Sequence, residues 1–248
     1  MSDALSPNSL GDDYGINLQV HEGDFNLNQV KFLVYGESGA GKTMFASTWP
    51  NCVFLDIDKG MASITRQVHR INVDSWEDIQ KAYQFLKSGD HAFTTVVVDS
   101  LNELQYLAMR TIVNKYPNIR RAYDNLPSQS DYGKMLDDYE KMVRHIKGLS
   151  MNVIYICNVS AQEFETDTVQ PQLVGKSSAR NLSRMVDVIG HLYKTEGGDD
   201  AKTRVMVFDA VNYVTKDRSG VLPQTMQDPS FDLLYKYWVQ RSRSVSED

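Results

Sequence analysis

The feature that most constrains this chain is a glycine-rich loop between an apolar run and a segment compatible with a helix. The apolar run covers residues 30–35, and the loop has the spacing G-x-x-x-x-G-K-T. Small residues there let successive backbone N–H groups close around a phosphate, and the strand–loop–helix context makes the motif specific. The loop comprises Gly36, Glu37, Ser38, Gly39, Ala40, Gly41, Lys42 and Thr43.

A nucleoside triphosphate is the ligand that this loop predicts. Lys42 is expected to reach the β- and γ-phosphates, and the Thr43 hydroxyl is expected to bind Mg²⁺. A second apolar run, residues 93–98, ends at Asp99. Many strands end in an acid, but behind a phosphate-binding loop such a carboxylate is predicted to hold the water shell of the same Mg²⁺. ATP and Mg²⁺ are therefore the expected cofactors.

Length and composition favour one α/β domain inside a cell. The 248 residues are 42% hydrophobic and 23% charged, which is ordinary for a globular protein. The sequence has no secretory signal and no apolar stretch long enough to cross a bilayer, and Cys52 and Cys157 lie in apolar runs typical of reduced core cysteines. We therefore expect a cytoplasmic protein that makes no membrane contact.

Charge divides the chain into three predicted parts. Residues 1–28 carry acids but no Lys or Arg, which predicts a mobile acidic arm. Such an arm either becomes ordered against a neighbouring molecule or is a tail without a role. Residues 29–240 form the predicted domain, and residues 241–248 the predicted C-terminal tail.

Basic residues gather in two acid-free stretches although the net charge is −6. Residues 104–123 and 168–186 contain no Asp or Glu. Cations interleaved with aromatics suit base stacking along single-stranded DNA, whereas a solvated loop with its aromatics packed on the domain is the alternative interpretation. The candidate DNA-binding residues are Lys115, Tyr116, Arg120, Arg121, Lys176 and Arg180.

The order of these features resembles the RecA-type ATPase core. A strand at residues 52–56 ends in an acid, the Asp99 strand follows, and a strand at residues 152–158 ends in the amide Asn158. More narrowly, the Asp99-Ser100 pair and residues 171–176 and 216–218 resemble phage-encoded Sak-type single-strand annealing proteins. The resemblance implies an α/β, RecA-like P-loop NTPase fold. Helices would flank a mostly parallel central sheet with an antiparallel extension near the C-terminus.

The same resemblance implies roles for residues outside the loop. Asp58 corresponds to the acid that orients or deprotonates the attacking water, and Asn158 to the amide that senses the γ-phosphate. RecA-type proteins usually have the longer Glu and Gln at these two positions, which predicts slow hydrolysis here because a base must reach its water. Lys216 and Arg218 correspond to cations that reach the γ-phosphate of a neighbouring subunit.

Together these roles imply an ATPase that forms a homo-oligomeric ring or filament on single-stranded DNA and is stimulated by it. It would promote annealing or strand pairing beside a single-strand-binding protein, in the host-cell cytoplasm if it is phage-encoded. Two alternatives remain open. One is a motor or loader ATPase that remodels a protein partner, which the acidic charge suits. The other is a P-loop kinase, for which the sequence offers no evident acceptor-binding lid.

Overall fold

The computed structural model describes residues 25–61, 64–115, 126–160, 168–175, 177–196 and 202–245. Its centre is one nine-stranded sheet with the order β3-β2-β4-β5-β1-β6-β7-β9, and β8 pairs with β6. The strands are β1 (Lys31–Gly36), β2 (Cys52–Asp56), β3 (His69–Asn72), β4 (Thr95–Asp99), β5 (Asn152–Asn158), β6 (Val188–Glu196), β7 (Lys202–Val207), β8 (Lys216–Asp217) and β9 (Thr225–Gln227).

The sheet is parallel from β3 to β6 and antiparallel from β6 to β9. Strands β1, β2 and β4 are buried along their whole length, because helices cover both faces, so their sequences are nearly continuous apolar runs. This architecture confirms the predicted fold class, including the antiparallel extension near the C-terminus.

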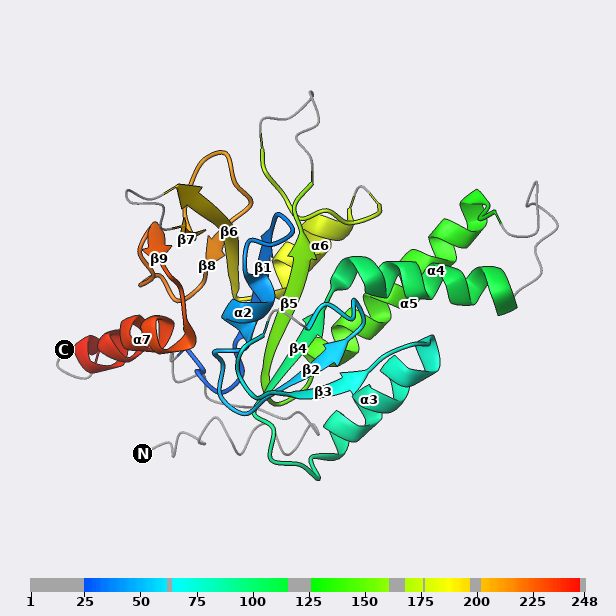
Figure 1. Cartoon of the computed structure of the whole chain (residues 1–248), viewed down its shortest axis with the longest axis horizontal. Helices are drawn as coiled ribbons and strands as arrows, with labels where there is room; N and C mark the ends of the chain where they lie inside the picture. Colours follow the sequence, from blue (N-terminus) through cyan, green and yellow to red (C-terminus); the bar gives the residue numbers. More distant parts are fainter. Residues whose placement is uncertain are drawn as a thin grey trace, which may run out of the picture.

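Helices flank the central sheet (Figure 1), and two apolar layers hold them on it. Alternate residues of β1 point to opposite faces, so Leu33 and Tyr35 join one layer and Phe32 and Val34 the other. The first layer includes residues of α3 (Trp76–Ser88), α4 (Leu101–Lys115), α5 (Gln129–Lys147) and α6 (Ser178–Met185). The second includes residues of α2 (Lys42–Ala46) and α7 (Phe231–Val245).

Local sequence signals explain where several helices begin and end. Ser75 and Asp78 form a capping box at the start of α3, and Gly89 ends that helix in the left-handed region with φ 73°. Two elements have no clear sequence signal: the exposed strand β3 and the helix α6. Helix α6 ends at Met185, and strand β6 begins soon after, at Val188.

The ends of the chain differ from the sequence prediction in one respect. Helix α7 continues to Val245, so most of the predicted tail 241–248 is helical. At the other end, Phe25 packs against Trp238 with ring centroids 5.5 Å apart, and residues 1–24 of the predicted acidic arm lie outside the described residues. Within the described chain, every helix is too short or too polar to cross a bilayer.

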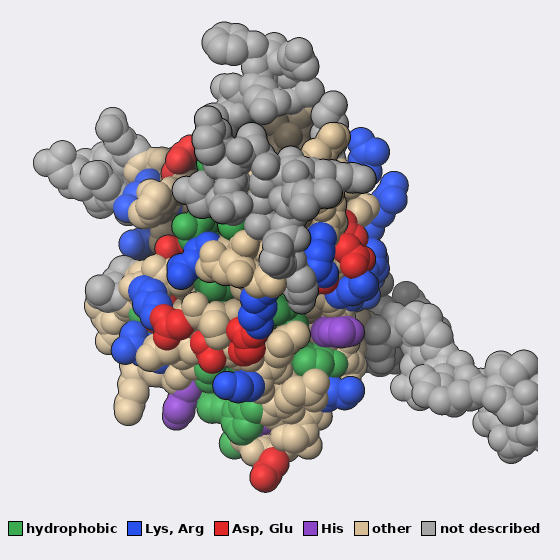
Figure 2. Space-filling view, turned by 90° about the vertical axis from the view of Figure 1, so that its right-hand side faces the viewer, with side chains coloured by type: hydrophobic (Ala, Val, Ile, Leu, Met, Phe, Trp, Pro, Cys, Tyr) green, Lys and Arg blue, Asp and Glu red, His purple; other side chains and the backbone are tan. Residues whose placement is uncertain are grey.

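Charges of both signs are interspersed on the face that α3, α4 and α5 cover (Figure 2). Lys134 and Lys141 of α5 form ion pairs with Asp138 and Asp137, four residues away on the same helix. Lys115, at the end of α4, pairs with Glu77 of α3. This face is therefore a solvated, mixed-charge surface rather than a uniformly basic one.

Candidate nucleotide-binding site

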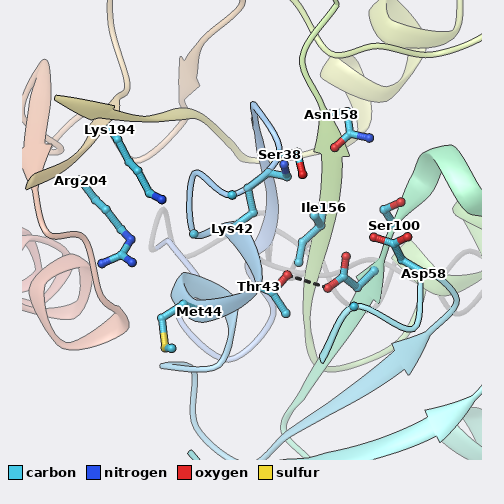
Figure 3. A pocket seen from close by; sticks show the side chains of 14 residues that line it. Ser38, Lys42, Thr43, Met44, Asp58, Ser100, Ile156, Asn158, Lys194 and Arg204 are labelled. Carbon is cyan, nitrogen blue, oxygen red and sulfur yellow. Dashed lines mark hydrogen bonds between the residues drawn. The ribbon is translucent and has the colours of Figure 1, made fainter. Parts of the chain in front are cut away.

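The predicted site residues lie at the edge of the sheet where the parallel strands end. A cavity of about 420 Å³ opens there, and its walls come from the glycine-rich loop, from the ends of β4 and β5, and from β6 and β7. Parallel strands bring their carboxyl ends to one edge, so residues distant in sequence meet at this point. Lys42, Thr43, Asp58, Asp99 and Asn158 all line this cavity, as Figure 3 shows.

The loop has the backbone that the motif predicts. Gly41 precedes α2 with φ 102° and Gly39 has φ 77°, conformations that side chains other than glycine rarely adopt. Gly36 is required for another reason, because a Cβ on it would lie 2.0 Å from the backbone oxygen of Leu192 in β6. Since α2 is short, the phosphate would be bound by the N–H groups of the loop more than by a helix dipole.

Lys42 is buried at the floor of the cavity. Its ammonium group donates to the carbonyl oxygens of Gly36 at 2.7 Å and Glu37 at 2.9 Å. Burial lowers the pKa of Lys42, and the nearby Asp99 carboxylate opposes that shift. A buried ammonium group at this position is stabilised by a bound polyphosphate, so the geometry fits the predicted role.

Thr43 and Asp99 form the predicted metal pair. The Thr43 hydroxyl donates to Oδ2 of Asp99 at 2.9 Å. Burial raises the pKa of Asp99 to about 6, and the hydrogen bond from Thr43 opposes that shift. Oxygen donors are the ligands that Mg²⁺ prefers, and it commonly completes its shell with phosphate oxygens and water. The pair therefore fits Mg²⁺, although the described residues contain no cluster of three or more His, Cys, Asp or Glu.

Asp58 and Asn158 lie on the same side of Lys42 (Figure 3), and both line the cavity together with Asp99. The backbone N–H of Asp58 donates to the Asp99 carbonyl oxygen at 3.1 Å, which ties the segment after β2 to the end of β4. Asn158 is the last residue of β5, and its N–H donates to Oδ1 of Asn102 in α4 at 2.9 Å. Asp58 and Asn158 therefore line the same cavity as the loop, and their roles as a water-activating acid and a γ-phosphate sensor stay predictions.

Two cations that sequence reasoning missed also line the cavity. Strand β6 extends beyond the end of β1 and carries Lys194, and Arg204 of β7 lies directly opposite Lys194 in the antiparallel register. Figure 3 shows both side chains on the side of Lys42 away from the carboxylates. The spacing of residues along the chain could not reveal them, because the β6–β7 register decides which side chains extend over the loop.

Lys216 and Arg218, predicted to act on a neighbouring subunit, lie away from this cavity. Lys216 pairs with Ile189 near the start of β6, and its ammonium group donates to the carbonyl oxygens of Ser183 at 2.9 Å and Val186 at 2.6 Å. Arg218 forms an ion pair of 2.8 Å with Asp187. Neither residue can reach the nucleotide site of its own chain, so their role stays a prediction about an assembly.

The DNA-binding candidates are only partly described. Arg180 is exposed on α6, and Lys115 is paired with Glu77, which offsets its charge. Tyr116, Arg120, Arg121 and Lys176 lie outside the described residues. The prediction for these six residues therefore stays a prediction.

Comparison with known proteins agrees with the motif and the topology. The family model described as "AAA domain" matches residues 28–219, which is most of the chain. This chain belongs to the AAA domain family. The match begins before β1 and ends after β8, so it includes the loop, the ends of the parallel strands and the start of the antiparallel extension. This AAA domain is a P-loop ATPase domain with a RecA-like core.

Solved structures give more distant likenesses. A KaiC-like protein from the hyperthermophilic archaeon Pyrococcus horikoshii is 13% identical, with a TM-score of 0.40 over 77% of this chain and 87% of that one. The RadB recombinase is 16% identical, with a TM-score of 0.42 over 72% of this chain and 80% of that one. Neither likeness indicates what this AAA domain binds. A search of curated protein sequences finds no significant match.

Proposed function

We propose that this AAA domain hydrolyses ATP with Mg²⁺ and uses the cycle to pair or anneal single-stranded DNA. Following the sequence resemblance, the proposed protein is a phage recombination protein of the Sak type that works beside a single-strand-binding protein. The single observation that carries this proposal is the position of Asn158. This residue lines the nucleotide cavity and also a second, adjoining groove of about 940 Å³.

The second groove has a chemistry that suits unpaired bases. Its walls include the amide side chains of Asn158, Gln170 and Gln172, which can donate and accept hydrogen bonds at base edges. The amides of Asn102 and Gln105 bond to the wall itself. The exposed Tyr106, with 59% of its surface accessible, lies one turn beyond Asn102 on α4 and offers a face for stacking. Exposed Arg180 follows Ala179 at the rim. The amide side chains in the lining are Asn102, Gln105, Asn158, Gln170 and Gln172.

Hydrogen bonds link the nucleotide side to the groove side. Asn102 accepts from the Asn158 N–H and donates to the carbonyl oxygen of Gln172 at 2.6 Å. Gln105 exchanges two hydrogen bonds with Val174, at 2.8 and 3.1 Å. A shift of Asn158 toward a γ-phosphate would therefore be transmitted to residues 172–174, which form one wall of the groove.

Hydrolysis in this proposal depends on residues that line the nucleotide cavity. Lys42 and the loop N–H groups would bind the phosphates, Thr43 and Asp99 would hold Mg²⁺, and Asp58 would orient the attacking water. Mg²⁺ would neutralise charge that develops on the phosphoryl oxygens. Because Lys216 and Arg218 cannot reach their own site, full activity in this proposal requires a homo-oligomer in which a neighbouring chain supplies them.

The test is retention of a labelled single-stranded oligonucleotide with no nucleotide, with ADP and with a non-hydrolysable ATP analogue. We expect tight retention only with the ATP analogue, and faster annealing of complementary strands under the same condition. Asn158→Ala should bind ATP but lose the difference between ADP and the analogue. Tyr106→Ala should weaken retention of the oligonucleotide with the ATP analogue. Tyr235→Ala, which removes an exposed tyrosine on helix α7, is its matched control.

Equal retention in all three nucleotide states, with or without a single-strand-binding protein, would contradict the proposal. The net charge of −6 and the Lys115–Glu77 ion pair favour one rival, an ATPase that loads or remodels a protein partner. ATPase activity that responds to a protein and ignores DNA would support that rival.

A further inference from the structure

We propose that Lys194 and Arg204, called here the pocket pair, bind the nucleotide of their own chain on the side away from the metal. The inference deepens the proposed function and rests on its ATP-binding part only. It assigns a nucleotide-binding role to two residues of the antiparallel extension. Neither residue belongs to the P-loop or to the strand ends that carry Asp99 and Asn158.

The first support is position. Strand β6 pairs with β1 up to Tyr35, next to the loop, and continues to Glu196, so Lys194 lies beyond the end of β1 and above the loop. A Cβ built on Gly39 would lie 4.0 Å from the Lys194 ammonium nitrogen. A Cβ on Gly41 would lie 2.4 Å from Nε of Arg204. Both cations therefore lie against the loop that binds phosphate.

The second support is the pairing state of Arg204. Its Nε is buried and has no hydrogen-bond partner among the described residues. Its backbone N–H and carbonyl oxygen, in contrast, are both hydrogen-bonded. The Arg204 N–H donates to Oδ1 of Asp228 at 3.2 Å, and the Asp228 N–H donates to the Arg204 carbonyl oxygen at 2.7 Å. A buried guanidinium donor without a partner is costly, and a phosphate or ribose oxygen is the acceptor that this cavity would supply.

The third support is the polarity of the cavity. Asp58 and Asn158 lie on one side of Lys42, where Mg²⁺ and the γ-phosphate are expected, and the pocket pair lies on the other (Figure 3). A triphosphate bound across the loop would then place its α- and β-phosphates and ribose toward Lys194 and Arg204. Two positive charges there would balance the phosphate charge that Mg²⁺ does not neutralise.

This position predicts a specific kinetic signature. Contacts away from the γ-phosphate stabilise ADP and ATP alike, so their loss raises KM and leaves kcat unchanged. A single chain should also bind nucleotide without a neighbour, because its own extension supplies the cations. A γ-phosphate contact would give the opposite result, a fall in kcat with little change in ADP affinity.

The experiment is calorimetric titration of ADP and of a non-hydrolysable ATP analogue into wild-type, Arg204→Ala, Arg204→Lys and Lys194→Ala proteins. We expect Arg204→Ala to weaken both ligands by the same factor, roughly ten- to a hundredfold, the range for one charge-assisted hydrogen bond. Lys194→Ala should lose less, and Arg204→Lys should recover part of the loss. Protein concentrations are chosen so that mass measurement shows a single chain.

Controls separate this inference from general damage and from the proposed function. Arg110→Ala and Lys236→Ala remove exposed cations far from the cavity and should bind ADP like wild type. Unchanged ADP affinity in Arg204→Ala, or a loss confined to the ATP analogue, overturns the inference whatever the protein does with DNA. If the wild-type protein binds ADP but never retains DNA, the proposed DNA function is contradicted, and the inference about the pocket pair is not.

Discussion

Two pairs of basic residues in the antiparallel extension differ in what their side chains contact. The pocket pair, Lys194 and Arg204, extends over the phosphate-binding loop of its own chain. The second pair, Lys216 and Arg218, is called here the β8 pair. Lys216 donates to the carbonyl oxygens of Ser183 and Val186, and Arg218 forms an ion pair with Asp187. Residue type and spacing alone therefore do not identify a phosphate-binding cation, because the register of β6 with its neighbours decides which pair reaches the site.

The largest expected effect is the loss of ATP binding in Lys42→Ala, and the effects of both pairs are compared with it. Lys42 is the buried cation that touches the loop itself, so its loss should abolish saturable ATP binding up to millimolar nucleotide. Equilibrium binding measures this directly, with thermal unfolding as the check on folding. Retained ATP affinity in this variant would mean that the pocket pair, and not Lys42, dominates binding.

The next largest effect concerns the β8 pair. Arg218→Ala should leave ATP binding intact and lower kcat of the assembled protein, by about a thousandfold if it acts as an arginine finger. Turnover is measured with single-stranded DNA, at protein concentrations above and below assembly. Wild-type turnover in Arg218→Ala would remove the trans role from this residue and leave Lys216 as the one member of the β8 pair still proposed to act in trans.

Strand β6 links the two pairs, and His191 lies on it between them. The ring is 7% exposed and contacts the rings of Tyr35, Tyr193 and Tyr213. Burial lowers the pKa of His191 to about 4, and the Lys42 charge adds to that shift. Between pH 6.5 and 4 the unfolded chain therefore takes up a proton that the folded chain does not, so stability falls as the pH falls.

We expect His191→Phe to remove this part of the acid sensitivity, worth at most about 3 kcal/mol at the low end of the window. Urea unfolding at several pH values between 7 and 4.5 measures it, with the exposed His69→Gln as control. If the free energy of unfolding of His191→Phe varies with pH as in the wild type, the stability of β6 does not depend on a neutral histidine.

The smallest expected effect separates the pairs by stability rather than by activity. Lys216→Ala removes two hydrogen bonds from a charged donor to backbone carbonyls and should lower the free energy of unfolding by about 1–2 kcal/mol. Lys194 has no such bonds among the described residues, so Lys194→Ala should unfold like wild type. Equal destabilisation of both variants in thermal unfolding would erase the structural distinction between the pairs.

Much of the site could be predicted because it depends on local sequence. Gly36 to Thr43 specify a loop conformation through glycine and small residues, and strand ends such as Asp99 and Asn158 follow short apolar runs typical of buried strands. The strands β1, β2, β4 and β5 and the capping box of α3 were predictable for the same reason. The exposed strand β3 and the polar helix α6 were missed, because neither has an apolar run or a marked start.

Local sequence is enough to specify the phosphate-binding loop, the carboxylate and amide at the strand ends, and the α/β class, because each depends on a short stretch of chain with its own steric and hydrophobic preference. The folded arrangement of β6, β7 and β8 is needed to know that Lys194 and Arg204 face the cavity while Lys216 and Arg218 do not. Their positions follow from strand pairing over long sequence separations. A one-residue shift of β7 against β6 would move Arg204 to the opposite face of the sheet.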